Sequence, residues 1–265
     1  MKFLVKLIIA MMLVTVVVSC GRTPSRGGGG GAVYVGGNTP QLGDSDPHVW
    51  RSGHPYGQQV HGIDISRWQG DINWAQVRGA GISFAFIKAT EGGDHSDPNF
   101  QRYWREAGAA RIPRGAYHYF YFCRSGAEQA AWFIRNVPRE RGALPPVIDL
   151  EWTNSRTCPR RPPPQEIKRE AEIFMQIVGQ YYGQRPLIYT TVDFYKDNQL
   201  GTMRAEFWLR SVADHPRARY PGQRWTFWQY TGTGIVPGIR GDVDLNAFAG
   251  SSADWARWLQ THLSR

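Results

Sequence analysis

The chain has 265 residues and a formal net charge of +9 at pH 7. A positive charge of this size favours anionic partners, such as cell-envelope polymers or membrane surfaces. The sequence contains no motif that reads the grooves of DNA or RNA, so we do not expect nucleic acid as a partner.

The first 19 residues have the features of a bacterial targeting signal. Lys2 and Lys6 precede an apolar run from Leu7 to Val18, which is short for a membrane span and typical of a secretory signal. The small and aliphatic residues before Cys20 resemble a lipoprotein cleavage site. We therefore expect cleavage before Cys20 and lipid attachment to its sulfur, the alternative being an ordinary signal peptide cut nearby.

Residues 20–58 predict a flexible tether between this lipid and the rest of the chain. The segment is rich in Gly, Pro and Ser and has no apolar periodicity, so it cannot bury a core. Gly21 is not the aspartate that retains lipoproteins at an inner membrane. By resemblance to lipoproteins, we expect a cell-envelope location, at the outer membrane if the host has two membranes.

Residues 59–265 are long enough for one sizeable domain, in which strand and helix patterns alternate. The expected strands are residues 61–66, 83–90, 116–122, 146–152, 187–191, 207–212, 224–230 and 242–248. The expected helices are residues 74–80, 98–110, 125–136, 164–182 and 251–263. This alternation predicts an α/β fold with a parallel sheet, most simply a TIM-like (β/α) barrel, and the helices become sparse after residue 191.

Local signals mark three of the helix starts. Asn73 with Gln76, and Ser125 with Glu128, have the spacing of capping boxes. The third helix start is marked by Pro98, which follows an aspartate and favours the first position of a helix. We therefore expect the three helices to begin directly after Asn73, at Pro98 and at Ser125.

The strand at 146–152 carries two carboxylates, Asp149 and Glu151, separated by one residue. Residues i and i+2 of a strand point to the same face, so the two acids are neighbours. Like charges at this spacing raise one pKa and leave one acid protonated beside one ionised, which is the arrangement that glycoside hydrolysis uses. The alternative is a pair that closes the strand end and binds arginines.

Further polar residues lie at the ends of the other expected strands. The carboxyl ends of barrel strands form the face on which active sites are built. These residues are Asp64, Ser66, Lys88, Thr90, Glu91, Tyr117, His118, Tyr119, Tyr121, Trp228, Gln229, Tyr230, Asp242 and Asp244. Their convergence on one rim favours a catalytic site.

Six motifs in a fixed order carry a family resemblance. They are HGIDIS at 61–66, FIKATEG at 86–92, GAYHYF at 115–120, PVIDLE at 146–151, WQY at 228–230 and DLNAF at 244–248. Together they resemble the glycoside hydrolase family 25 lysozymes over residues 60–250. His95 departs from the family, which usually has an aromatic or aliphatic residue there, and this difference concerns local substrate contacts.

The resemblance implies a barrel of five β/α units followed by three strands with few helices. It also implies hydrolysis of the β-1,4 bond between N-acetylmuramic acid and N-acetylglucosamine in peptidoglycan, without a cofactor. Matched by position, Glu151 is the general acid, Asp149 is the second carboxylate, and Asp64 and Asp244 complete the acidic cluster. Asp149 is expected to be ionised and to stabilise the developing positive charge or to orient the acetamido group, which we expect to assist hydrolysis with net retention.

Three other residues are candidates for substrate binding. Tyr119 and Trp228 offer aromatic rings for sugar contacts, and Glu91 offers a polar group, although core packing or loop capping would also explain them. His61 and His118 lack metal-ligand spacing, so we expect no metal.

Cys123 and Cys158 follow consecutive strands, whose loops are neighbours in a barrel. Because an exported protein meets an oxidising compartment, we expect these two residues to form a disulfide. We also expect a monomer. Two other functions remain open: a non-catalytic peptidoglycan-binding module, and a hydrolase of another N-acetylhexosamine polymer such as chitin.

Overall fold

The computed structural model describes residues 42–264, except residues 52 and 154. The expected targeting signal, Cys20 and the first part of the expected tether, up to residue 41, lie outside the described residues. Within the described part of the chain, no helix is long and apolar enough to cross a membrane.

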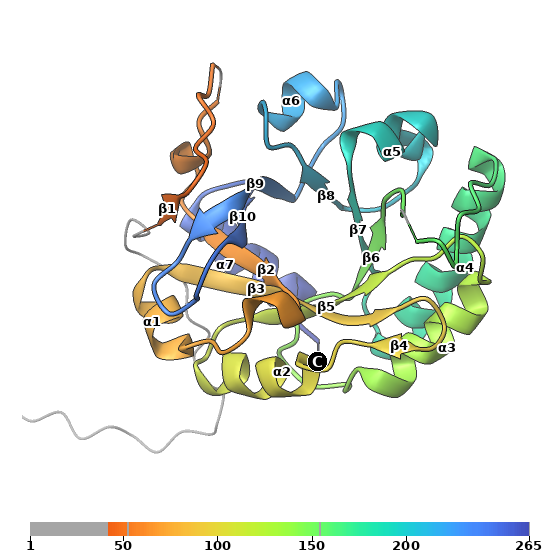
Figure 1. Cartoon of the computed structure of the whole chain (residues 1–265), viewed down its shortest axis with the longest axis horizontal. Helices are drawn as coiled ribbons and strands as arrows, with labels where there is room; N and C mark the ends of the chain where they lie inside the picture. The colour runs from red at the N-terminus through yellow and green to blue at the C-terminus, as the bar shows by residue number, and fades with distance from the viewer. Residues whose placement is uncertain (1–41, 52, 154, 265) are drawn as a thin grey trace, which may run out of the picture. The chain divides into compact units, whose positions relative to one another are not determined.

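Eight strands close into a barrel (Figure 1). In order around the ring they are β2 (His61–Ile65), β3 (Ile82–Glu91), β5 (Arg114–Tyr119), β6 (Val147–Leu150), β7 (Leu187–Thr190), β8 (Phe207–Arg210), β9 (Phe227–Ile235) and β10 (Val243–Phe248). Neighbours from β2 to β9 pair in parallel, whereas β10 is antiparallel to both β9 and β2. The expected barrel is confirmed, but its sheet is mixed rather than wholly parallel.

Helices follow the first five barrel strands in turn. They are α1 (Trp74–Gly79), α2 (Phe100–Ala109), α3 (Gly126–Asn136), α4 (Pro164–Tyr182) and α5 (Val192–Asp197). The one-turn α6 (Pro216–Arg219) follows β8, and α7 (Ser252–His262) follows β10. This confirms the expected five β/α units followed by three strands with few helices.

Two of the three expected helix starts agree closely with the structure. The side chains of Asn73 and Ser125 accept hydrogen bonds from the backbone N–H groups of Gln76 and Glu128. Helix α2, however, starts at Phe100, two residues later than expected. The reason is that the carboxylate of Asp97 accepts hydrogen bonds from the backbone N–H groups of Arg67 and Asn99, and thereby organises a loop.

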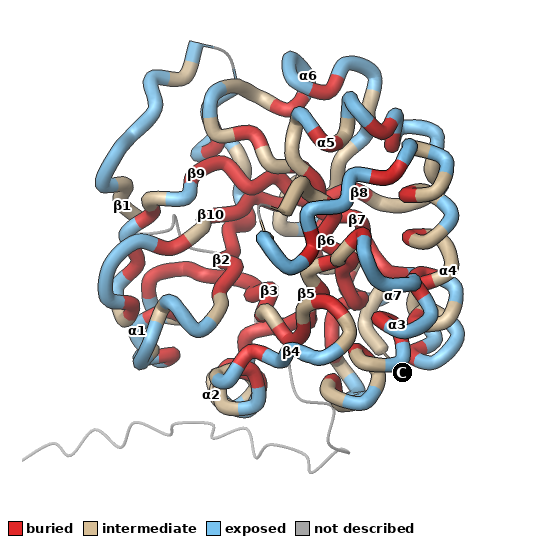
Figure 2. The backbone as a smooth tube through the Cα atoms, turned by 45° about the vertical axis from the view of Figure 1, so that its right-hand side comes forward, coloured by how far each residue is buried: buried red, intermediate tan, exposed pale blue. Residues whose placement is uncertain are grey.

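Aromatic side chains fill one end of the barrel interior. Phe86 stacks on Trp208 with ring centroids 4.7 Å apart, and Phe227 lies edge-on to Phe86 at 5.1 Å. Gly62 and Gly115 make room for this packing, because a Cβ at either position would lie within 3 Å of the ring of Phe84 or Phe86. Figure 2 shows that the buried residues concentrate in the strands. With one end filled, polar side chains can gather only at the other end.

Residues 42–58 differ from the flexible tether that their composition predicts. The short strand β1 (Gly43–Asp44) pairs with the end of β9, and Ser45 donates a hydrogen bond to Asp242 at 2.8 Å. Trp50 packs edge-on against Trp228, with ring centroids 5.2 Å apart. Backbone pairing and one aromatic anchor therefore attach this segment to the barrel, and Figure 1 shows β1 beside β9.

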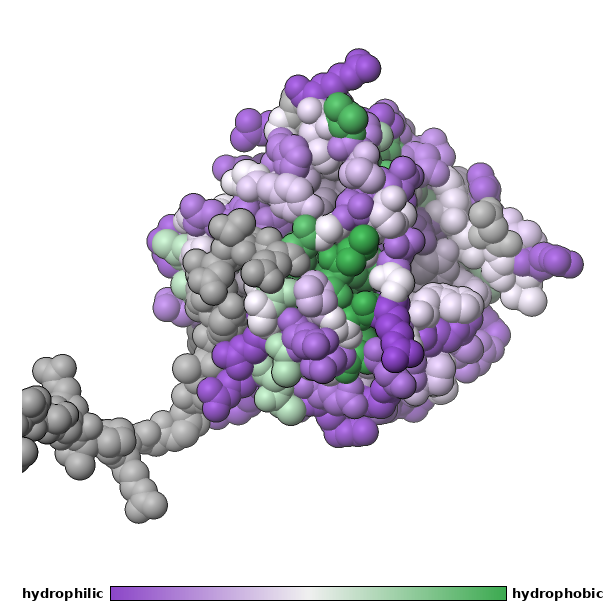
Figure 3. Space-filling model, turned by 60° about the vertical axis from the view of Figure 1, so that its left-hand side comes forward, coloured by the Kyte–Doolittle hydropathy of each residue, from purple (hydrophilic) through white to green (hydrophobic). Residues whose placement is uncertain are grey.

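One side of the domain presents apolar atoms to the surface. Figure 3 shows hydrophobic side chains gathered in a central area of this side, with hydrophilic side chains around it. Among the described residues, Val49 and Ile235 are large apolar residues with 82% and 48% of their surface exposed. Scattered exposure of this kind is common in folded domains and does not by itself identify a binding site.

The closing helix α7 is fixed to the barrel by a charged contact. Glu206 accepts hydrogen bonds from His262 at 2.7 Å, from Trp258 at 3.0 Å and from Thr226 at 2.8 Å. The hydrogen bond to Glu206 raises the pKa of His262. Because this pKa is higher in the folded protein than in the unfolded chain, the contact stabilises the fold below the unfolded pKa of about 6.5.

This stabilisation is lost as the pH rises through the folded pKa of His262. We therefore expect the melting temperature of the wild type to fall more between pH 5.5 and 8.5 than that of His262→Gln. Thermal unfolding at several pH values measures the difference, with the exposed His48→Gln as the matched control. Parallel pH curves for the wild type and His262→Gln would contradict the assignment.

Candidate active site

The reversed direction of β10 brings two distant acids together. Asp244 lies directly opposite Asp64 in the antiparallel pair of β10 and β2. Asp64 is buried, and its Oδ2 accepts hydrogen bonds from Gln229 Nε2 at 2.9 Å and Asn246 Nδ2 at 2.8 Å. Opposed residues of a sheet lie about 5 Å apart, so the two carboxylates share one environment.

A chain of hydrogen bonds holds Asp64 in place. Tyr189 donates to the Gln229 side-chain oxygen at 2.9 Å, and Trp208 donates to the Asn246 side-chain oxygen at 2.7 Å. Both amides are thereby oriented with their NH₂ groups toward Asp64. This network fixes the carboxylate without neutralising it.

Asp149 lies on β6, and Glu151 directly follows the last residue of this strand. The charge of Glu151 acts on Asp149, so the two acids belong to the same region. Asp149 is 6% exposed, and its Oδ1 atom is buried without a hydrogen-bond partner among the described residues. Glu151 is half-buried and interacts with the hydroxyl of Tyr119. One oxygen of Asp149 is therefore shielded from water without a hydrogen-bond donor, which makes the charge of this acid costly.

Burial raises the pKa of all four acids, and repulsion within the cluster adds to this for Asp149 and Asp244. Burial raises the pKa of Asp64 to about 6, and burial with the charge of Asp64 raises that of Asp244 to about 8. Burial raises the pKa of Glu151, and burial together with the charge of Glu151 raises that of Asp149 well above its ordinary value. The cluster thus favours the protonated form of its acids, as a group that donates a proton requires.

The expected proton distribution between Asp149 and Glu151 differs from this result. We expected an ionised Asp149 beside a protonated Glu151, whereas the protein raises the pKa of Asp149 strongly. The physical reason is that Asp149 is the more buried of the two and its Oδ1 lacks a donor. The charge of one acid therefore opposes ionisation of the other, and the two titrate as a pair.

A second group of side chains borders the acids. Lys88 donates a hydrogen bond to Glu91 at 2.7 Å, and its ammonium lies 4.8 Å from the ring centre of Tyr119. Tyr121 also donates to Glu91. Tyr119 thus lies beside Glu151, whereas Glu91 is held by Lys88 and Tyr121.

Trp228 is not placed to stack on a sugar. Its side chain is fully buried, and its indole N–H donates to the backbone oxygen of Ser211 at 2.8 Å. Successive residues of a strand point to opposite faces, and in β9 the inner positions belong to Phe227 and Gln229. We therefore correct the expected substrate contact: Trp228 packs on the outer side of the barrel, and Gln229 reaches the acids.

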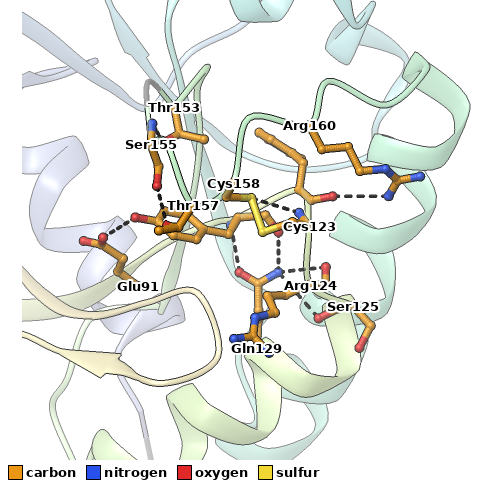
Figure 4. Close-up of a disulfide and its surroundings, with 12 residues drawn as sticks. Glu91, Cys123, Arg124, Ser125, Gln129, Thr153, Ser155, Thr157, Cys158 and Arg160 are labelled. Atoms are coloured by element: carbon orange, nitrogen blue, oxygen red, sulfur yellow. Dashed lines mark hydrogen bonds between the residues drawn. A yellow bond between two sulfur atoms is a disulfide. The ribbon is translucent and has the colours of Figure 1, made fainter.

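The expected disulfide between Cys123 and Cys158 is confirmed, with a Cα–Cα distance of 5.6 Å. It joins the loops that follow β5 and β6, as Figure 4 shows. The same view shows Glu91 and Gln129 near these loops. Gln129 links α3 to the loop after β5 through hydrogen bonds to Tyr121 and Arg124. The disulfide therefore cross-links the segments that follow the strands bearing Tyr119 and Glu151.

The inspection of strand ends missed the roles of three residues. Gln229 and Asn246 orient Asp64, and Arg210, the last residue of β8, lies near enough to lower the pKa of Asp64, Asp244 and Glu151. Strict alternation within β8 and β9 was the available signal for Arg210 and Gln229. In the described residues, no group of three or more His, Cys, Asp or Glu side chains is arranged to hold a metal ion.

The geometry can be compared with known proteins. The model of the family described as glycosyl hydrolases family 25 matches residues 63–239. The chain belongs to glycosyl hydrolase family 25. The matched segment includes the strands that carry Asp64, Asp149 and Glu151, whereas Asp244 lies five residues beyond its end.

Relatives of this family 25 chain agree with that assignment. The uncharacterized protein YegX of Escherichia coli (strain K12) is 35% identical over 202 residues, covering 74% of this chain and 72% of YegX. Lysozyme M1 of Streptomyces globisporus is 37% identical over 207 residues, covering 73% and 69% of the two chains. A family 25 glycosyl hydrolase from Bacillus anthracis has a similar structure, with a TM-score of 0.73 and 33% identity over 81% of this chain and 98% of that chain.

Proposed function

We propose that this family 25 protein is a lysozyme that hydrolyses the β-1,4 bond between N-acetylmuramic acid and N-acetylglucosamine in peptidoglycan. The observation that carries the proposal is the family match across β6, which bears Asp149 and is followed directly by Glu151. The similarity to lysozyme M1 supports the choice of substrate.

In this proposal, Glu151 is the general acid. It donates its proton to the glycosidic oxygen as the bond from that oxygen to C1 of N-acetylmuramic acid breaks. Burial raises the pKa of Glu151 and so favours the protonated form that this step needs. A water molecule then supplies the hydroxyl group at C1 and returns a proton to the acid cluster, so the enzyme is regenerated.

In this proposal, Asp149 orients the acetamido group of the substrate. Its carboxyl group is suited to accept a hydrogen bond from the N–H of the substrate's acetamido group. That contact would turn the acetamido oxygen toward C1, where it displaces the leaving group and gives net retention after hydrolysis. Asp64, held by Gln229 and Asn246, and Asp244 border the same space and maintain its negative field.

Side-by-side digestion tests the proposed substrate. The purified full-length protein is incubated with peptidoglycan and with chitin, and soluble fragments and sedimented enzyme are measured together. We expect fragments from peptidoglycan and few from chitin. Equal or faster digestion of chitin would identify a different N-acetylhexosamine hydrolase, and sedimentation with peptidoglycan without fragments would identify a binding module.

We also propose that the enzyme acts from the cell envelope while anchored by a lipid on Cys20. The support is the sequence alone, namely the basic and apolar segment before Cys20 and the Gly-rich segment after it. Mass spectrometry of the mature N-terminus tests this proposal. A lipid-modified Cys20 at the first position would support it, and an unmodified N-terminus elsewhere would overturn it.

A further inference from the structure

Arg210 occupies the inner face of the barrel next to the acid cluster. It is the last residue of β8. Trp208, two residues earlier, stacks on Phe86 inside the barrel, whereas Leu209 belongs to the layer between strands and helices. Alternation along the strand therefore points Arg210 inward. The register of β8 and β9 places Arg210 beside Gln229, the residue whose amide holds Asp64.

The guanidinium group of Arg210 faces acids but is not bound to any of them. Its charge acts on Asp64, Asp244 and Glu151. Within the part of the chain that the structure describes, its side chain forms no hydrogen bond and no ion pair within 4.0 Å. A guanidinium has five N–H donors in a planar fork, so Arg210 presents unused donors at the border of the site.

The other cation of the site, Lys88, is already engaged. It lies on β3, four strands from β8 in either direction around the ring of eight, and it donates to Glu91 at 2.7 Å. The two cations therefore stand on opposite sides of the acid cluster. Of the two, Arg210 is the one without an ion-pair partner among the described residues, and it keeps all its donors for an anionic group that arrives with the substrate.

A substrate carboxylate would need such a cation here. Four acids surround the reacting bond, and a further negative charge close to them would be repelled. N-acetylmuramic acid differs from N-acetylglucosamine by a lactyl group, which ends in a carboxylate when no peptide is attached and in an amide when a stem peptide is attached. Stem peptides carry carboxylates of their own. Arginine binds carboxylates through two parallel N–H···O bonds, which makes it selective for this group.

We propose that Arg210 binds a carboxylate of the glycan strand and makes the enzyme selective for anionic strands over neutral ones. The proposal rests on the lysozyme function proposed above and adds the group by which the same site recognises its substrate. The carboxylate comes from one of two sources, the lactyl group of peptide-free strands or the stem peptide.

Four substrates distinguish the two possible sources of the carboxylate. They are peptide-free strands and peptide-bearing strands, each with its carboxylates intact or converted to neutral amides by carbodiimide coupling. We would measure kcat and KM for the wild type, Arg210→Gln and Arg210→Lys. Arg217→Gln is the matched control, because it removes one exposed positive charge from the neighbouring helix α6.

We expect Arg210→Gln to lower kcat/KM by about 10- to 100-fold on the strands that supply the carboxylate, mainly by raising KM. On the matching amidated strands, we expect wild type and Arg210→Gln to agree within about twofold. Arg210→Lys should recover part of the loss, and Arg217→Gln should behave as the wild type. The strand type that shows the difference identifies the source of the carboxylate.

Equal losses for Arg210→Gln on intact and amidated strands would overturn the proposal. That result would assign Arg210 to the electrostatics of the acid cluster, which acts on both substrates alike. To separate binding from a shifted pKa in the acid cluster, we would measure kcat/KM on intact and on amidated strands at several pH values and take the ratio of the two. A shifted pKa changes both values alike and cancels in this ratio. A wild type that releases no fragments from any strand would instead refute the lysozyme function itself.

Discussion

Replacing Glu151 with glutamine is expected to lower kcat/KM on peptidoglycan by about 10²- to 10⁴-fold. Glutamine has nearly the same shape and still accepts the hydrogen bond from Tyr119, but it has no proton to give to the glycosidic oxygen. Initial rates of reducing-end formation measure the loss. Thermal unfolding of the same sample shows whether the fold is intact.

Glu172→Gln is the matched control for this variant. Glu172 pairs with Arg185 on the surface at 2.9 Å, away from the barrel interior, so the same chemical change there should leave kcat/KM within about twofold of the wild type. If a folded Glu151→Gln protein kept its activity, Glu151 would not be the general acid.

Asp149→Asn is expected to have an effect of similar size, about 10²- to 10³-fold in kcat, because a neutral amide stabilises developing positive charge less well than a carboxylate. It should also move the pH profile. The repulsion between Asp149 and Glu151 raises the pKa of both groups, so removing the charge of Asp149 makes Glu151 easier to ionise.

The high-pH limb of the activity profile should move to lower pH. Activity requires protonated Glu151, so the high-pH limb of kcat/KM lies at the pKa of this acid in the free enzyme. A lower pKa in Asp149→Asn moves the limb to lower pH, and a profile of residual activity from pH 4 to 9 measures it. A limb that stays in place, or moves to higher pH, would show that the two acids are not coupled.

The barrel and its acid pair could be predicted from the sequence because each left a strong local signal. The spacing of Asp149 and Glu151 within a β-favouring run places both on one face, and α4 was predicted with the bounds that the structure has. Cys123 and Cys158 follow neighbouring strands, and that order was sufficient to pair them.

Other features had no such signal. Residues 227–230 are buried on both faces of β9, so hydrophobicity does not distinguish the inner Gln229 from the outer Trp228. The direction of β10 is a property of the barrel as a whole and leaves no periodic pattern in the chain. It nevertheless determines that Asp244 meets Asp64 at the start of that strand.

Residues 42–58 show that composition alone does not predict whether a segment is attached to the domain. Gly and Pro content predicts a linker, but β1 is held through backbone hydrogen bonds to β9, which do not depend on side-chain hydrophobicity. The packing of Trp50 on Trp228 could be recognised only once the outer position of Trp228 was known. Similarly, the position of Arg210 beside the acids could be recognised only from its pairing with Gln229 in the barrel.

Analysis of the new ends in digested peptidoglycan tests the central claim most directly. The full-length wild type and Glu151→Gln are incubated with peptidoglycan, the fragments are reduced with borohydride, and the terminal sugars are identified by mass spectrometry. We predict reduced N-acetylmuramic acid at the new ends with the wild type and none above background with the folded variant. New ends of reduced N-acetylglucosamine, anhydro sugars, or ends formed equally by Glu151→Gln would contradict the account.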